Sequence, residues 1–143
     1  MAKQQSGTDD LRRLVRDLGK LPAEVRKELR PTLRKAGVRA RTRAKGNASW
    51  SRRIPGAIRL QVSFAKRRPG VALRVDQQRA PHARALENLG KPGFFRHPFF
   101  GDREQWVSQR ARPFLFSAAQ EEWRSINADI AAAVFTAARK HGF

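Results

Sequence analysis

Residues 58–75, IRLQVSFAKRRPGVALRV, decide the fold class of this chain. Apolar and polar side chains alternate on both sides of the Pro69-Gly70 pair, which is the pattern of two half-buried strands joined by a turn. The turn also carries Lys66, Arg67 and Arg68. The stretch therefore predicts a β-hairpin with one apolar face and an exposed cationic turn.

Two helices are predicted before this hairpin. Apolar residues recur at helical spacing over residues 8–19 and again over residues 21–47, where basic side chains occupy the other faces. Pro31 lies inside the second pattern, so we expect a kink or break near Arg30. Residues 1–8 are expected to form a flexible end.

After the hairpin, residues 80–86 favour a short helical turn. Residues 88–104 are predicted to form a long loop, because glycine and proline interrupt a cluster of phenylalanines. The segment 105–107 favours a third strand. A C-terminal helix is predicted over about 114–140, with a capping box at Ser117-Ala-Ala-Gln120. Together these elements predict one α+β domain over residues 1–143, with two N-terminal helices and a small antiparallel sheet.

Composition excludes several kinds of chemistry. The 143 residues include no cysteine and only three histidines, so no disulfide, thiolate nucleophile or sulfur-ligated zinc is available. The histidines have no metal-ligand spacing, and no phosphate-binding or nucleophile motif is present. We expect no enzymatic activity and no cofactor. No apolar run approaches the length of a membrane span, and the N-terminus lacks a secretion signal, which favours synthesis in a cytoplasm.

Positive charge is concentrated in the first half. The net charge is +19, and residues 1–75 hold 21 of the 31 basic side chains but only five of the 12 acidic ones. Such a surface attracts phosphates or an acidic protein, although arginine enrichment could also leave a merely solvated face. The candidate residues facing DNA or an acidic partner are Arg39, Arg41, Arg43, Lys45, Arg52, Arg53, Lys66, Arg67 and Arg68.

Aromatic side chains are concentrated in the second half. Aromatic anchors are typical of protein interfaces, but the same rings could cover the core of their own chain. The sequence leaves these two interpretations open. The candidate subunit contacts are Phe94, Phe95, His97, Phe99, Phe100, Trp106, Arg112 and Phe114.

Several short motifs, in this order and spacing, resemble the neck family of long-tailed bacteriophages, whose members are head–tail connector, tail-component or tail-completion proteins. The resemblance covers about residues 10–143. The motifs follow the basic N-terminal helix and are SRRIPGAI (51–58) and the hairpin after it, APHARALE (80–87), RHPFFG (96–101), WV (106–107) and RPFL (112–115).

The resemblance implies a subunit without catalytic residues that assembles into a ring, commonly of six copies. Such a ring lies at the head–tail junction of the virion, between head-closure or adaptor proteins and the tail-terminator or tail-tube proteins, and genomic DNA passes through it. The cations would then face DNA phosphates, which carry no sequence information, or an acidic neighbour. The alternative from the residues alone is a small basic protein that binds nucleic acid without sequence preference.

Overall fold

The computed structural model describes residues 22–63 and 70–142. Its elements are, in chain order, α2 (Ala23–Asn47), α3 (Ile54–Ala57), β1 (Ile58–Ser63), β2 (Gly70–Val75), α4 (Ala83–Glu87), the short 3-10 helix η1 (Asn88–Gly90), β3 (Phe94–Phe99), β4 (Asp102–Arg110) and α5 (Phe116–Lys140). The α+β class is confirmed. The helix predicted over residues 8–19 and the turn with Lys66, Arg67 and Arg68 lie outside the described residues.

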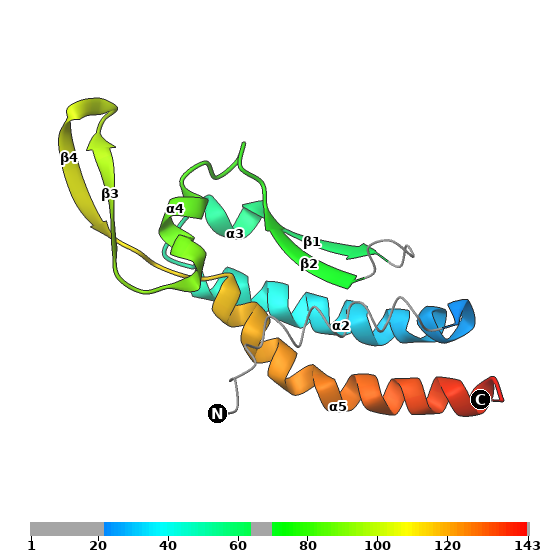
Figure 1. The fold of residues 1–143 in the computed structure, drawn as a ribbon. Coiled ribbons are helices and arrows are strands. Elements are labelled where there is room, and N and C mark those ends of the chain that lie inside the picture. The colour runs from blue at the N-terminus through cyan, green and yellow to red at the C-terminus, as the bar shows by residue number, and fades with distance from the viewer. Residues whose placement is uncertain (1–21, 64–69, 143) are drawn as a thin grey trace, which may run out of the picture.

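Helices α2 and α5 run side by side in opposite directions and form the base of the molecule (Figure 1). Leu29, Leu33 and Ala36 of α2 pack with Ile126 and Ile130 of α5 in one buried cluster. Their spacing of three, four or seven residues places them on one face of each helix. Burial of each large apolar side chain contributes about 1.5–3 kcal/mol, so this seam stabilises the base.

The β1–β2 sheet packs on the other side of α2 (Figure 1). The two strands are antiparallel, with Ile58 opposite Val75 and Ser63 opposite Gly70, which confirms the predicted hairpin. Gly37 marks the closest approach of α2 to this sheet, because a Cβ there would lie 2.6 Å from Leu60 Cδ1. Helix α2 is therefore the middle layer between α5 and the β1–β2 sheet.

A second cluster, the main core, lies where the C-terminal end of α2 meets α3, α4 and the start of α5. Phe114, Ile54 and Ile58 are its largest fully buried side chains. Alanines supply much of the rest, and small side chains let these short elements approach closely. The members of the main core are Ala44, Ala48, Ile54, Ala57, Ile58, Ala80, Ala83, Leu86, Phe114 and Ala118.

The predicted break near Arg30 is absent, since α2 continues through Pro31. Proline removes the donor for the carbonyl four residues earlier, at Lys27. Pro31 and Lys27 are both exposed, so water can satisfy that carbonyl. The buried residues Leu29 and Leu33 on the opposite face hold both halves of the helix against α5.

The predicted loop over residues 88–104 is wrong, because most of it forms η1, β3 and the start of β4. The prediction rests partly on proline, which usually interrupts a strand, and Pro98 is one of the prolines in this segment. It lies instead in a strand of a two-stranded sheet, where an edge position tolerates its missing N–H. The strand predicted at 105–107 is confirmed as part of β4.

The start of α5 also differs from the expected capping box. No side chain at its N-cap makes the capping hydrogen bond. Instead the Glu87 carboxylate, at the end of α4, accepts hydrogen bonds from the backbone N–H groups of Phe114, Leu115 and Phe116 at 2.7–2.9 Å. A carboxylate is favourable at this end of a helix because the first N–H groups lack intrahelical partners. Glu87 therefore ties α4 to α5.

Candidate functional site

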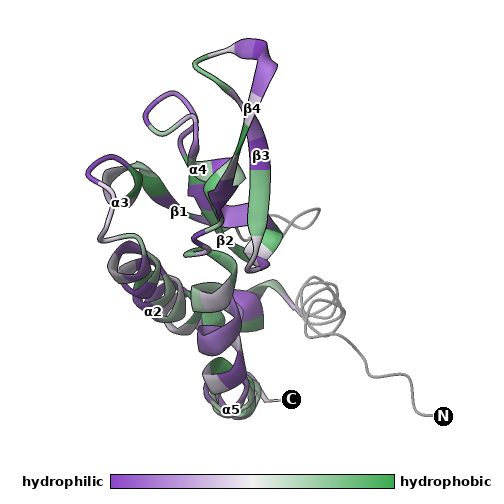
Figure 2. Ribbon diagram, turned by 90° about the vertical axis from the view of Figure 1, so that its left-hand side faces the viewer, coloured by the Kyte–Doolittle hydropathy of each residue, from purple (hydrophilic) through white to green (hydrophobic). Residues whose placement is uncertain are grey.

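The β3–β4 hairpin projects away from the helices (Figure 1), and a second view shows the same separation (Figure 2). Its root is held firmly. Ala111 N–H donates to the Gly93 carbonyl at 2.7 Å, and Arg112 N–H donates to the Leu86 carbonyl of α4 at 2.8 Å. Phe95 packs against the main core. The hairpin is thus an arm anchored at one end.

Large aromatic side chains are exposed along this arm. Phe94 is 71% exposed and Phe100 is 94% exposed, while Phe99 and Trp106 are each about half exposed. Apolar surface left in water contributes no burial free energy to folding, and clustered apolar surface of this kind is typical of interaction sites. Of the two interpretations left open by the sequence, the subunit-contact interpretation suits these four residues.

The tip of the arm, which we define as Phe99–Asp102, is a tight turn. Phe99 pairs with Asp102, and the two residues between them, Phe100 and Gly101, have φ values of 47° and 83°. Positive φ at both positions is usual for a two-residue hairpin loop, but asparagine or glycine normally occupies the first of them. Phe100 therefore combines an unfavourable backbone conformation with an almost fully exposed ring. Neither property helps the isolated chain to fold.

The remaining predicted contacts are placed differently. His97 is half-buried, and its Nδ1 lies 3.1 Å from the Pro98 carbonyl oxygen. The Arg112 guanidinium stacks 4.5 Å above the Trp50 ring, a partner that sequence reasoning missed. Phe114 is fully buried in the main core, so it has no surface with which to contact a neighbouring copy. For Phe114 the core interpretation applies.

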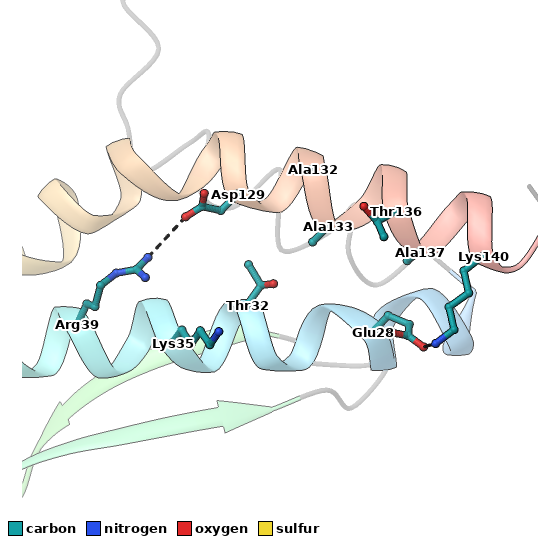
Figure 3. A pocket seen from close by; sticks show the side chains of 10 residues that line it. All are labelled: Glu28, Thr32, Lys35, Arg39, Asp129, Ala132, Ala133, Thr136, Ala137 and Lys140. Carbon is teal, nitrogen blue, oxygen red and sulfur yellow. Dashed lines mark hydrogen bonds and ion pairs between the residues drawn. The ribbon is translucent and has the colours of Figure 1, made fainter.

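Two of the predicted phosphate-facing cations are paired within the chain. Arg39 Nε donates to Glu122 Oε1 at 2.5 Å, and its Nη2 lies 3.7 Å from Asp129 Oδ2 (Figure 3). Arg43 pairs with Glu121. The acids lie about 80 positions later in the sequence, on α5, so the sequence around the two arginines does not show them. The Arg39 and Arg43 side chains remain 49% and 47% exposed, so each links α2 to α5 and still has surface open to an external anion.

Other predicted cations remain available to a partner. Lys45, Arg52 and Arg53 are exposed, and none of the three pairs with an acid among residues 22–63 and 70–142. Arg41 is half-buried. These residues follow one another at the end of α2 and in the connection to α3. The exposed candidate cations without an acid partner in these ranges therefore lie at the C-terminal end of α2 and just after it.

An ion pair that sequence reasoning also missed joins the N-terminal end of α2 to the C-terminal end of α5. Lys140 Nζ lies 2.9 Å from Glu28 Oε1 (Figure 3), and His141 Nε2 lies 3.7 Å from the same oxygen. The hydrogen bond from Lys140 lowers the pKa of Glu28, with a smaller contribution from His141. Like the Arg39 contacts, this pair fixes the antiparallel register of the helices.

Residues 22–63 and 70–142 contain no group of three His, Asp or Glu side chains placed to hold a metal ion. None of the helices in these ranges has both the length and the hydropathy needed to cross a membrane. No protein-family model, curated protein or solved structure matches the chain.

Proposed function

We propose that this protein is a structural subunit of the neck of a long-tailed bacteriophage. The observation that carries the proposal is the anchored arm with exposed aromatic rings, which is suited to bind another protein surface. The order of sequence motifs that resembles the neck family supports the same role. In this role the chain acts by assembly, and it needs no catalytic residue and no cofactor.

The proposed assembly is a ring, with six copies as the expected number, at the head–tail junction of the virion. Its neighbours would be head-closure or adaptor proteins on one side and tail-terminator or tail-tube proteins on the other. Copies would be made in the host cytoplasm and join the particle there. The firm root of the arm supports this role, because a rigid arm presents its tip in one orientation to every neighbour.

The exposed cations of the long second helix and the segment after it would face DNA in the channel or an acidic neighbouring ring. Lys45, Arg52 and Arg53 are the described residues best suited to this contact, because they are exposed and pair with no acid of residues 22–63 and 70–142. Phosphate contacts of this kind are independent of sequence, which suits a channel through which a whole genome passes. Arg39 and Arg43 are less suited to this role, because their guanidinium groups also pair with acids of α5.

The second candidate is a basic protein that binds nucleic acid without sequence preference, and the net charge of +19 favours it. Binding of that kind depends steeply on salt concentration and needs no ordered oligomer. It does not use the exposed aromatic tip, since phenylalanines on an arm with two acids nearby are poorly placed for phosphates.

Cryo-electron microscopy of phage particles that carry this chain tests the proposal. The expected result is a ring of density at the head–tail junction into which the α2–α5 pair and the arm fit. Absence of the chain from purified particles, together with its recovery on bulk DNA from the cell, would overturn the neck role and favour the second candidate.

A further inference from the structure

A groove of about 390 Å³ lies beside α4, between β2 and the start of α5. We call it the α4 groove. Its apolar lining includes Leu73, Ala83, Leu89 and Leu115, and its charged lining includes Arg74 and Arg84. Both arginines are exposed. The third charged group there, Glu87, is already engaged by three backbone N–H groups. The groove therefore offers apolar surface with positive charge at its edge.

We propose that the tip of the arm of one copy inserts into the α4 groove of the next copy. This inference rests on the proposed subunit role, which makes a second copy the partner. The tip supplies the matching chemistry. Phe99 and Phe100 are apolar and in edge-to-face contact at 4.6 Å, so they form one compact unit. Volumes of 300–1,000 Å³ are typical of pockets that bury a ligand, and the α4 groove falls in that range.

Charge supports the same pairing. Beside the two rings the tip region carries Asp102 and Glu104, with Arg103 between them, so it is net negative in a strongly positive chain. Both acids are exposed. Insertion of the rings would bring these carboxylates near Arg74 and Arg84 at the groove edge. Complementary charges of this kind select the partner and fix its orientation.

The backbone gives an independent indication. Three non-glycine residues have positive φ in residues 22–63 and 70–142, namely Asn88, Leu89 and Phe100. Leu89 is 79% exposed and lines the α4 groove, while Phe100 forms the tip. Bulky apolar residues in this conformation are rare, and strained positions of this kind concentrate at functional sites. The strain thus occurs on both surfaces of the proposed contact.

The arm cannot fill the groove of its own chain. Six residues of β3 extend about 20 Å at about 3.3 Å per residue, and the tip of the arm lies away from α4 (Figure 1). Its root is hydrogen-bonded to Leu86 of α4. Tip and groove are therefore different surfaces held in a fixed relation. A contact between two different surfaces can repeat from copy to copy. It forms a closed ring when the rotation between successive copies brings the last copy into contact with the first.

Cysteine cross-linking tests this contact cleanly, because the full chain contains no cysteine. Phe100→Cys chains are mixed with Leu89→Cys chains under mild oxidation. Both positions are exposed, so neither substitution should prevent folding. The matched control replaces Leu89→Cys with Ala131→Cys, an exposed position on α5. The expected result is a disulfide-linked dimer from the first mixture, at a yield at least several-fold above the control mixture and above Phe100→Cys alone.

Charge reversal provides a second readout. Asp102→Lys with Glu104→Lys in the tip partner should lower the cross-linked yield by roughly tenfold, and Arg74→Glu with Arg84→Glu in the groove partner should restore it. Copies that associate without this cross-link would overturn the tip-in-groove contact while leaving the proposed ring role intact. Strong linkage of Phe100→Cys to itself, or a monomer with no cross-link at high concentration, would also overturn the contact. The location of the chain in particles tests the ring role separately.

Discussion

The α2–α5 pair and the β3–β4 arm differ in how far their large apolar side chains are exposed to solvent. In the pair, apolar residues are buried along one seam, and arginines on α2 meet acids on α5. In the arm, aromatic rings stand in solvent and the backbone at Phe100 is strained. In the proposed role, the α2–α5 pair therefore serves folding and the tip of the arm serves association. Substitutions in the α2–α5 pair should change stability, and those at the tip should change only association.

The largest expected effect is on the free energy of unfolding, and it distinguishes Phe114 from Phe100. Phe114→Ala removes a fully buried ring from the main core and should lower the free energy of unfolding by about 3–5 kcal/mol. Phe100→Ala removes a ring that is 94% exposed and should change it by no more than about 0.5 kcal/mol. Urea denaturation followed by circular dichroism measures both. A large loss of stability in Phe100→Ala would break the comparison, because the arm would then belong to the folding unit.

The next largest expected effect is on the thermal unfolding midpoint, and it distinguishes two glycines of α2. In Gly37→Ala the new Cβ would lie 2.6 Å from Leu60 Cδ1 and 2.7 Å from Val71 Cγ1, so these side chains or the strands that carry them must shift, at a cost of about 1–3 kcal/mol. Gly46→Ala is the matched control, because no atom lies within 4 Å of its Cβ and alanine favours a helix. Thermal unfolding should show a lower midpoint for Gly37→Ala and an unchanged or higher one for Gly46→Ala. Equal midpoints would contradict the close packing of α2 on the sheet.

These two predictions also show how far the sequence alone leads. Alternation over residues 58–75 and helical spacing predicted strands β1 and β2 and helices α2 and α5, because burial of an apolar face produces both patterns. They did not predict that α2 lies between α5 and the sheet. Pro31 does not break α2, and Pro98 lies in a strand, since each has an exposed or edge position that tolerates the missing donor. A proline alone does not report whether its missing N–H would have needed a partner.

The candidate site was predictable only in part. The aromatic cluster was located, but its division into exposed Phe100 and buried Phe114 depends on tertiary packing. The acids that pair with Arg39 and Arg43 lie on α5 and are distant in sequence, so the charge of the first half alone did not indicate these pairs. Glu87 had no local signal either, since the N–H groups that it binds are 27–29 residues away.

The smallest expected effect is a pH dependence of stability, and it arises from Glu28 in the α2–α5 pair. The pKa of Glu28 is lowered from 4.5 in the folded chain, so its contribution to stability is present above about pH 4.5 and is lost as the pH falls through the folded value. Carboxyl titration by nuclear magnetic resonance should give a midpoint below 4.5 for Glu28. In Lys140→Ala, which removes the main cause of the shift, the midpoint should rise toward 4.5. An unchanged midpoint would show that the pair does not form in solution.

The central claim is that the tip of the arm associates copies without contributing to the fold. Sedimentation velocity of the wild-type chain and of the Phe99→Ser, Phe100→Ser double variant, at equal concentration, tests it most directly. The account predicts a defined oligomer for the wild type and a monomer for the variant, with the same unfolding midpoint for both. The same sedimentation coefficient for the two proteins would contradict it.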